Sequence, residues 1–153
     1  MAIVGVISDT HGLMRPEALE ALRGSAHILH AGDVGEPEIL EKLREIAPVT
    51  AVRGNVDQGP WASTLPRADV IEIEDVSIYM LHILEDLDLK PEAAGLGVVV
   101  YGHSHKPASE TKNGVLYFNP GSAGPRRFNL PVTVGRLILT GGVVRGEIIA
   151  LRI

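Results

Sequence analysis

Three apolar runs alternate with two helical patterns in the first third of the chain, and this order restricts the fold more than any other feature. The runs are AIVGVIS, AHILHAGD and PVTAVRGN. Between them, RPEALEALRG and EPEILEKLREI repeat apolar residues at helical spacing. A strand–helix–strand–helix–strand order favours parallel strands joined by right-handed crossovers.

The rest of the chain is rich in predicted strands. A hairpin pattern runs through DVIEIEDVSIYML and a buried strand through LGVVVYGHSH, and two further hairpins turn at Asn113-Gly114 and Gly141-Gly142. Only LEDLDLKPEAAG has the pattern of a short helix or helical turn. We therefore expect an α/β fold of two packed mixed sheets with helices outside, as a single domain over residues 1–153. A single doubly wound sheet is disfavoured because too few helices remain to cover it.

Composition and charge narrow the kind of site that the chain can build. There is no cysteine among the 153 residues, so a metal ion would have to bind to histidine, carboxylate, amide or backbone groups. The net charge of −5 argues against a broad basic surface for nucleic acid. The apolar run at the N-terminus is too short for a membrane span or a secretion signal, so we expect a cytoplasmic protein without membrane contact.

Five predicted strands end in polar side chains that can bind a metal ion. Ligand sites of open α/β sheets lie outside the carboxyl ends of the strands, and residues i and i+2 of an extended segment point the same way. The donor residues are Asp9, His11, Asp33, Asn55, His82, His103 and His105. Taken singly, Asp9 and Asp33 also fit helix N-caps or turns. His82, inside the apolar run YMLHILED, also fits a buried core histidine.

The number and type of these donors favour two metal ions over one. Seven nitrogen and oxygen donors exceed the needs of a tetrahedral zinc ion. They suit two divalent ions that share a bridging carboxylate and clamp the attacking and leaving oxygens of a phosphoryl transfer. Imidazole, carboxylate and amide oxygen together favour Mn²⁺, Fe, Ni²⁺ or Zn²⁺ over Ca²⁺.

Five motifs, in this order along the chain, resemble those of the calcineurin-like metallophosphoesterases, and most of all those of the small YfcE-like phosphodiesterases. The motifs are SDTHG, HAGDVG, RGNVD, YGHSHKP and NPGSAGPRR. The resemblance implies a four-layer α/β/β/α sandwich and a dinuclear site, for which we expect Mn²⁺ first. It also implies that a metal-bridging hydroxide attacks the phosphorus, so that no side-chain nucleophile is needed.

The same resemblance assigns the donors to two metal positions. It implies that the first ion is bound by Asp9, His11 and His105. It implies that the second ion is bound by Asn55, His82 and His103, and that Asp33 bridges both. Among these residues, we expect Asp33, Asn55 and His103 to be catalytic through the ions they hold.

Two departures from the family pattern affect the expected activity. Many larger members have a histidine directly after Gly-Asn, where this chain has Val56. The resemblance implies that this histidine protonates the leaving group. Without it, good leaving groups should react best, so we expect phosphodiester hydrolysis over vigorous monoester hydrolysis. Small members tend to have His-Gly-His where this chain has His82-Ile83-Leu84, which predicts a changed pocket rim or a weakened second metal site.

The NPGSAGPRR stretch offers groups for a substrate phosphate. Arg126 and Arg127 carry positive charge, and Asn119 and Ser122 have side chains that can hydrogen-bond to phosphate oxygens. A surface hairpin loop with solvated arginines explains the same stretch equally well.

The main functional hypothesis is a divalent-metal-dependent phosphodiesterase that acts on a small-molecule or nucleotide diester. The alternative is a non-catalytic interaction module on the same fold, as in the retromer subunit whose metal positions are eroded, whereas this chain has the complete donor set. A metal-storage protein fits a phosphate-ready dinuclear site less well.

His30 is interpreted as a packed strand residue and Asp57 as a group that orients a ligand. Exposed hairpins leave homo-oligomer formation open.

Overall fold

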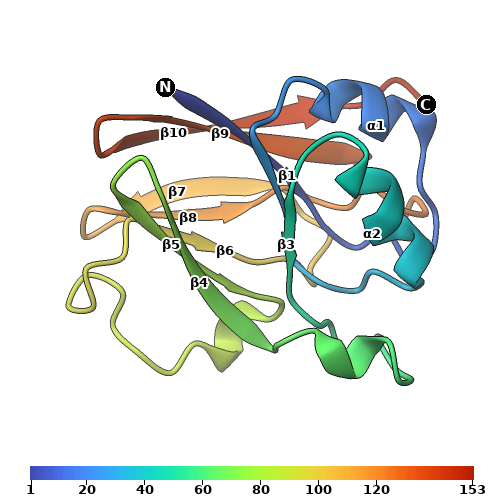
Figure 1. The fold of residues 1–153 in the computed structure, drawn as a ribbon, viewed down its shortest axis with the longest axis horizontal. Coiled ribbons are helices and arrows are strands. Elements are labelled where there is room, and N and C mark those ends of the chain that lie inside the picture. The colour runs from blue at the N-terminus through green and yellow to red at the C-terminus, as the bar shows by residue number, and fades with distance from the viewer.

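The computed structural model describes residues 1–153, which form two packed β-sheets and two short α-helices, α1 (Pro16–Leu22) and α2 (Pro37–Arg44) (Figure 1). The first sheet has the order β10-β9-β1-β2-β3. Its strands are β1 (Ala2–Ile7), β2 (His27–His30), β3 (Val49–Ala51), β9 (Thr133–Thr140) and β10 (Val143–Ala150). Strands β1, β2 and β3 are parallel and are joined through the two helices, as predicted, while β9 and β10 are antiparallel.

The second sheet has the order β4-β5-β6-β8-β7. Its strands are β4 (Ala68–Ile73), β5 (Val76–Leu81), β6 (Val98–Val100), β7 (Ala108–Lys112) and β8 (Val115–Asn119). The middle strands β5, β6 and β8 are parallel, and the two edge strands are antiparallel to their neighbours. The predicted turns at Asn113-Gly114 and Gly141-Gly142 are confirmed between β7 and β8 and between β9 and β10.

The register of both sheets aligns the carboxyl ends of the parallel strands. Ile7 pairs with His30, and His30 pairs with Ala51. In the second sheet, Met80 pairs with Val100 in the same way. The segments that leave these strands therefore start side by side within each sheet.

The main hydrophobic core lies between the two sheets and contains 14 buried residues. Val6 and Leu137 from the first sheet and Met80 and Phe118 from the second are fully buried members. Burying side chains of this kind contributes about 1.5–3 kcal/mol each relative to exposure. This core fixes the two sheets against each other, and with them the edge at which the parallel strands end.

Both α-helices cover the outer face of the first sheet (Figure 1). Leu22 of α1 and Leu43 of α2 belong to a second core cluster with Ile7 and Ile28 of the sheet. Because the apolar faces of the helices are used in this way, the middle strands β1 and β2 of the first sheet are buried on both sides. Neither α-helix has the length or the apolar run that crossing a membrane requires.

The predicted sandwich is confirmed in its two mixed sheets, and its fourth layer is reduced to a thin segment. A 3₁₀ turn at Leu84–Asp86 follows β5, and Leu84 and Leu87 pack against Leu81 on the outer face of the second sheet. The stretch from there to β6 contains turns and no α-helix. Pro91 and Gly95 explain this, because both residues interrupt helices.

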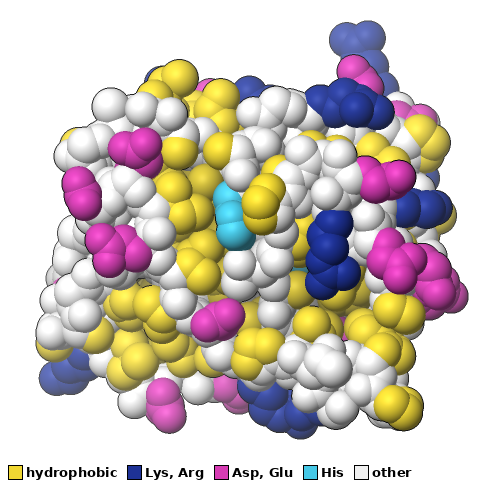
Figure 2. All heavy atoms as spheres, in the orientation of Figure 1, with side chains coloured by type: hydrophobic (Ala, Val, Ile, Leu, Met, Phe, Trp, Pro, Cys, Tyr) yellow, Lys and Arg dark blue, Asp and Glu magenta, His cyan; other side chains and the backbone are white.

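The surface carries charges of both signs. On the face shown in Figure 2, acidic and basic side chains are interspersed. Together with the net charge of −5, this arrangement gives that face no broad positive area of the kind that non-specific nucleic-acid binding uses.

Candidate metal centre

The segments that follow four strands meet at one edge of the sandwich. Asp9 follows β1 and Asp33 follows β2 in the first sheet. His82 follows β5, and His103 and His105 follow β6, in the second sheet. Residues far apart in the sequence thus come within contact distance, as expected for the carboxyl ends of parallel strands.

The backbone is left-handed at five of the donors. The φ angle is 56° at Asp9, 47° at His11, 55° at Asp33, 72° at His103 and 64° at His105. This conformation costs a residue other than glycine about 1–2 kcal/mol. Asp and His adopt it more readily than most residues, which is one reason why these side chains suit sharp turns. The strain is concentrated where the chain must turn to aim donors inward.

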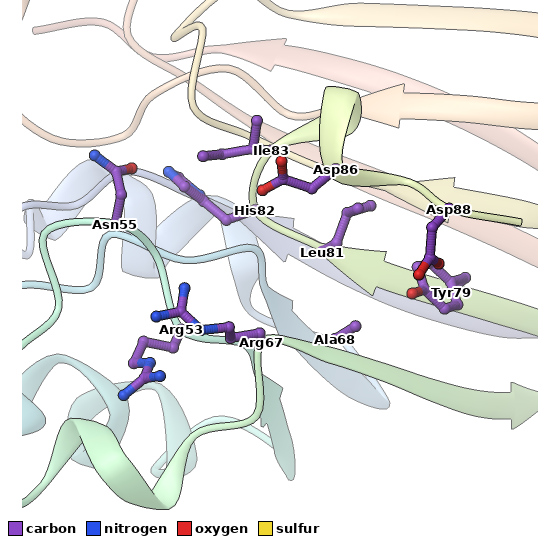
Figure 3. A pocket seen from close by; sticks show the side chains of 10 residues that line it. All are labelled: Arg53, Asn55, Arg67, Ala68, Tyr79, Leu81, His82, Ile83, Asp86 and Asp88. Carbon is purple, nitrogen blue, oxygen red and sulfur yellow. The ribbon is translucent and has the colours of Figure 1, made fainter.

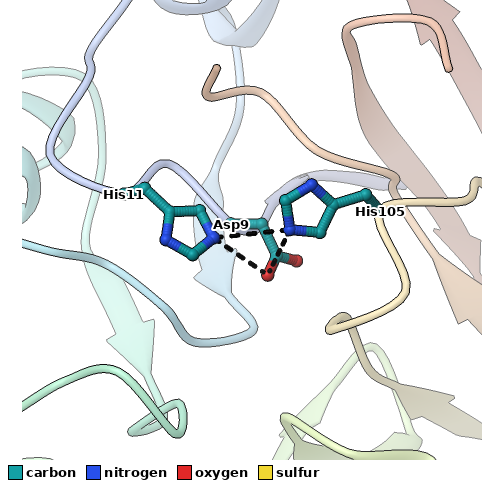
Figure 4. Close-up of side chains that lie close together, drawn as sticks. All are labelled: Asp9, His11 and His105. Atoms are coloured by element: carbon teal, nitrogen blue, oxygen red, sulfur yellow. Dashed lines mark hydrogen bonds and ion pairs between the residues drawn. The ribbon is translucent and has the colours of Figure 1, made fainter. Parts of the chain in front are cut away.

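Asp9, His11 and His105 form the first donor group (Figure 4). Oδ1 of Asp9 lies 3.7 Å from Nε2 of His11 and 3.4 Å from Nε2 of His105. The two Nε2 atoms lie 3.3 Å apart. One carboxylate oxygen and two imidazole nitrogens therefore converge, which is a donor set that divalent transition-metal ions accept.

Asp33, His82 and His103 form a second donor group beside the first. Oδ2 of Asp33 lies 3.1 Å from Nε2 of His82, and the ring centroids of His82 and His103 lie 5.3 Å apart. The same Oδ2 lies 3.7 Å from Nε2 of His11 in the first group. Asp33 therefore stands between the two groups, at the position that a bridging carboxylate requires.

Hydrogen bonds fix the direction in which the two carboxylates point. Ser8 Oγ and the His103 backbone N–H donate to Oδ2 of Asp9, at 2.7 Å and 3.1 Å, which leaves Oδ1 facing the histidines. The Val56 backbone N–H donates to Oδ1 of Asp33 at 3.0 Å, which leaves Oδ2 facing both donor groups. Each carboxylate thus has one oxygen held by the protein and one available to a ligand.

A hydrogen bond also selects the tautomer of His82. Its Nδ1 lies 2.8 Å from the carbonyl oxygen of Ala31, which can only accept, so Nδ1 carries the proton. Nε2 is then the atom that faces Asp33, with its lone pair available. A metal-binding histidine is oriented in this way by a backbone carbonyl in many proteins.

The charged groups shift the pKa of their neighbours. Burial alone would raise the pKa of Asp9, but the nearby imidazoles of His105, His11 and His82 hold it well below its usual range. Burial would also raise the pKa of Asp33, and the nearby imidazole of His82 reverses this. The Asp9 carboxylate raises the pKa of His11. Burial would lower the pKa of His82, and the Asp33 carboxylate reverses this. The carboxylates are therefore ionised, which suits the cluster to a bound cation.

Two buried atoms that face the cluster have no hydrogen-bond partner, and both are suited to bind a cation. These are Oδ1 of Asp9 and Nε2 of His82, which lie 3.8 Å apart. An unpartnered buried polar atom costs about 1–3 kcal/mol. The close approach of the His11 and His105 nitrogens likewise needs a proton or a cation between them. The residues present therefore fit two adjoining divalent-ion sites.

Asp57 holds two of the donor loops together. Its carboxylate accepts hydrogen bonds from the backbone N–H groups of Val34 at 3.2 Å, Gly35 at 2.9 Å and Gly54 at 2.9 Å. The residue is 5% exposed. The interpretation that Asp57 orients a ligand therefore changes in detail, because it orients the backbone after β2 and β3 and not a donor side chain.

His30 joins the loops that follow β1 and β2. Its Nδ1 accepts a hydrogen bond from the Gly32 N–H at 3.1 Å, and its Nε2 lies 3.0 Å from Thr10 Oγ1. The Thr10 hydroxyl in turn donates to the Val34 carbonyl at 2.8 Å, so Nε2 carries the imidazole proton. Complete burial lowers the pKa of His30 to about 4. The interpretation of His30 as a packed strand residue agrees with this position.

Asn119 and Ser122, which we expected to contact a phosphate, are buried and engaged inside the protein. Nδ2 of Asn119 donates to the Gly102 carbonyl and to Ser104 Oγ, both at 3.2 Å. Oγ of Ser122 donates to the Asp9 carbonyl at 3.1 Å. These bonds shape the loops that carry the donors, and they leave neither side chain free for a substrate.

Asn55, Arg126 and Arg127 are exposed. Asn55 lines a pocket together with His82, so it lies beside the second donor group. Arg127 lies near His11, because its positive charge opposes the rise in the pKa of that histidine. Among the residues expected to bind phosphate, Arg127 is therefore one whose charge acts on the candidate centre.

Sequence reasoning missed two arginines, Arg53 and Arg67, that line the pocket shared by Asn55 and His82. Arg53 stands two residues before Asn55 in the motif RGN, and this spacing was a signal that could have found it. No comparable signal marks Arg67, because a long irregular loop separates it from the motif. Only the folded chain brings it there.

Comparison with known proteins adds relatives to this geometry. The calcineurin-like phosphoesterase superfamily domain matches residues 1–142 of the chain. A protein of Methanothermobacter thermautotrophicus named "Probable metallophosphoesterase" is 35% identical over 159 residues, covering 96% of this chain and 91% of that protein. "Phosphodiesterase YfcE" of Escherichia coli is 28% identical over 160 residues, covering 85% of this chain and 84% of that protein.

Solved structures show the same architecture. The structure of YfcE from E. coli has a TM-score of 0.70 at 25% identity, and the match covers 98% of this chain and 100% of that chain. Vacuolar protein sorting 29 from Cryptosporidium parvum has a TM-score of 0.83 at 24% identity, covering 99% of this chain and 92% of that chain, and this likeness is one of fold. The domain match spans nearly the whole sequence, and the donor groups lie at the strand ends. The chain therefore belongs to the calcineurin-like phosphoesterase superfamily.

Proposed function

We propose that the protein is a divalent-metal-dependent phosphodiesterase with a dinuclear site. The observation that carries the proposal is the pair of adjoining donor groups, in which buried Asp9 Oδ1 and His82 Nε2 lack any partner in the protein. Asp33 lies between the groups with one oxygen facing both. Relatives named as metallophosphoesterases and phosphodiesterases support the same class of reaction.

The chain's own residues would hold the ions and leave room for a phosphate. Asp9, His11 and His105 would hold one ion, and His82, His103 and Asn55 the other, with Asp33 shared. When bound, such ions polarise a phosphoryl group and lower the pKa of the attacking water. Arg127, whose charge already acts on His11, would bind a non-bridging phosphate oxygen.

The residue after Asn55 favours diesters with good leaving groups. That residue is Val56, which is 45% exposed and supplies only its backbone N–H, to Asp33. A side chain at this place cannot give a proton to a departing alkoxide. Aryl diesters, whose leaving groups need little protonation, should therefore react faster than alkyl monoesters.

The donor types leave several ions open, and we propose Mn²⁺ first, with Ni²⁺, Fe or Zn²⁺ as substitutes. Imidazole and carboxylate donors accept all of them, and availability decides among them. The substrate would be a small-molecule or nucleotide diester, because the net charge of −5 does not suit a long polyanion. The cytoplasm, where such ions and nucleotides are present, is the proposed compartment.

The alternative function is a non-catalytic interaction module. Its support is the fold shared with vacuolar protein sorting 29. Against it stands the complete donor set, in which strained backbone at five donors is maintained. Strain of this kind is kept where the geometry of a site requires it.

The test is hydrolysis of bis(p-nitrophenyl) phosphate by metal-free protein after addition of Mn²⁺. The variant Asp33→Asn keeps the side-chain shape and removes the charge shared by both ions, so turnover should fall at least about 100-fold. Asp75→Asn, in the exposed turn between β4 and β5, is the matched control and should retain full turnover. Equal turnover by the wild type and Asp33→Asn would overturn the dinuclear proposal. Absence of metal uptake and turnover with every divalent ion would favour the interaction module.

A further inference from the structure

A pocket of about 260 Å³ opens beside the second donor group (Figure 3). Asn55 and His82 line it at the end near the candidate centre, and Tyr79 and Asp88 line it at the far end. Its volume lies just below the range of about 300–1,000 Å³ that is usual for drug-sized ligands. The pocket therefore has room for one sugar-sized or base-sized group of a substrate bound at the metal centre.

Two arginines, Arg53 and Arg67, stand on one side of this pocket (Figure 3). The backbone N–H of Arg53 donates to the Pro66 carbonyl at 2.8 Å, which keeps the two arginines next to each other. Neither side chain forms an ion pair or a hydrogen bond with another residue of the chain. Two positive charges that line the same pocket repel each other, and a bound anion relieves this repulsion.

The opposite side of the pocket is formed by the segment after His82. Ile83 and Asp86 lie there, with Leu81 below them in the strand (Figure 3). The carboxylates of Asp86 and Asp88 also take part in none of the ion pairs of the structure. Ionised carboxylates only accept hydrogen bonds, so they suit hydroxyl or amino groups of a ligand. A ligand that fits this pocket has an anionic group toward the arginines and hydroxyl or amino groups toward the aspartates.

We propose that this pocket is a specificity subsite for a second phosphate group, carried by a nucleotide-like portion of the substrate. Guanidinium groups bind phosphate oxygens through paired hydrogen bonds, and two of them side by side suit a doubly charged phosphate. The ribose hydroxyls and the base would meet the aspartates and the apolar wall. The inference rests on the proposed function, because it places the scissile diester at the candidate centre and the second phosphate at Arg53 and Arg67.

The first measurement compares two inhibitors of bis(p-nitrophenyl) phosphate hydrolysis in excess Mn²⁺. Adenosine 3′,5′-bisphosphate carries a second phosphate, and adenosine 5′-monophosphate does not. Charge-assisted hydrogen bonds to a phosphate should make the bisphosphate inhibit at a concentration about tenfold lower or more. In the double variant Arg53→Gln/Arg67→Gln, this ratio should fall toward one, because the contact with the second phosphate is lost while the contacts at the candidate centre remain.

The matched control is Arg23→Gln/Arg145→Gln, which removes two exposed arginines that do not line the pocket and that pair with Glu20 and Glu147. Exposed pairs of this kind contribute little, so the control should keep the wild-type ratio. Thermal unfolding of every variant shows whether it folds, and Arg67→Gln alone replaces the double variant if that one does not. Equal inhibition by both nucleotides in the wild type, or an unchanged ratio in the arginine variant, would overturn the subsite.

Failure of the subsite and failure of the proposed function are distinguishable. If the wild type shows no metal-dependent hydrolysis, the proposed function fails. Binding of adenosine 3′,5′-bisphosphate can then be measured directly by titration calorimetry. Tighter binding to the wild type and to the control than to Arg53→Gln/Arg67→Gln would support the pocket as a phosphate-binding site, and equal binding to all three would overturn it.

Discussion

At the scale of single residues, His30 supports the candidate centre without facing it. Its two ring nitrogens join Gly32, next to Asp33, and Thr10, next to Asp9. The imidazole is neutral, because its Nδ1 must accept a hydrogen bond while Nε2 donates. Protonation of His30 would place two donors opposite each other at Gly32, so the fold resists it.

This resistance predicts a pH dependence of stability. The pKa of His30 falls from its ordinary value of 6.5 to about 4 on folding. Below pH 6.5 the unfolded chain binds a proton that the folded chain refuses, so the free energy of unfolding falls as the pH drops from 6.5 to about 4. The loss from this residue is about 3 kcal/mol over that range. Urea unfolding of metal-free protein at pH 7 and pH 5 should show a shallower dependence in His30→Asn.

The comparison between variants isolates His30 from the other titrating groups. His27→Asn is the matched control, since His27 lies at the other end of β2, is only partly buried and hydrogen-bonds to Thr50 of β3. It should keep most of the wild-type pH dependence. An identical pH dependence in the wild type and His30→Asn would show that His30 does not cause the loss of stability at low pH.

Which polar residues lie at this edge could be predicted from sequence, and what each of them does could not be predicted in full. Asp9 and His105 come soon after apolar runs, so their position beyond a strand end could be predicted. Asn119 also follows an apolar run, and it was expected to contact a phosphate. It is buried because the loop at Gly102 and Ser104 packs over it. The side-chain amide of Asn119 donates its hydrogen bonds to these two residues. A sequence pattern does not contain such long-range packing.

At the scale of elements, the end of β3 packs tightly against the loop after β2. A Cβ atom added at Gly54 would collide with the backbone nitrogen and with Oδ1 of Asp33. We therefore expect Gly54→Ala to destabilise the fold by about 1–3 kcal/mol and to lower Mn²⁺ uptake, since either strand end must move. Chemical unfolding and metal analysis after dialysis measure the two effects.

Gly141→Ala is a suitable comparison for this substitution. Gly141 lies in the β9–β10 hairpin at φ 54° with open space around it. Alanine there meets only the backbone penalty of about 1 kcal/mol and leaves the candidate centre untouched. If both variants take up the same amount of Mn²⁺, the contact between Gly54 and Asp33 does not shape the site.

Asp57 makes a second prediction about the same pair of loops. In Asp57→Asn an NH₂ group replaces one of the oxygens that accept from Val34, Gly35 and Gly54. At least one buried N–H then loses its acceptor, which costs about 1–3 kcal/mol. Unfolding experiments should show this loss, and Mn²⁺ affinity should fall about 10-fold to 100-fold, as for other residues that support metal ligands. Wild-type values of both quantities would contradict the clamp.

At the scale of the whole molecule, the candidate centre connects the two sheets. Asp9 and Asp33 belong to the first sheet, and His82 and His105 to the second. An ion held by donors from both sheets binds the folded chain and not the unfolded one. At a concentration 100 times its Kd, one such ion adds about 2.7 kcal/mol to the free energy of unfolding.

Calorimetry should therefore detect the ions directly. Excess Mn²⁺ should raise the midpoint of thermal unfolding of the chelator-treated protein by roughly 5–10 °C. In Asp33→Asn the rise should be much smaller, because both ions lose a shared donor, while Asp75→Asn should behave as the wild type. A full rise in Asp33→Asn would place the stabilising ions elsewhere in the molecule.

Most of the architecture could be predicted from the sequence, because strands and turns follow from local sequence patterns. Each parallel strand is a short apolar run, and the turns at Asn113-Gly114 and Gly141-Gly142 use residues that accept positive φ. The layer outside the second sheet was the part that local patterns did not settle. Whether LEDLDLKPEAAG would form a helix depended on its packing against Leu81 and its neighbours, which only the assembled sheet provides.

The thin layer outside the second sheet separates the segment that lines the pocket from the residues that form the candidate centre. The donors are fixed by strand ends, a buried histidine and an aspartate clamp, so almost any change there disturbs the chemistry. Ile83 and Asp86 belong to a segment that lies outside the second sheet, where Leu84 and Leu87 pack against its outer face. If the pocket is the proposed subsite, insertions or exchanges in that segment would change the substrate group that it accepts and would leave the donor residues in place.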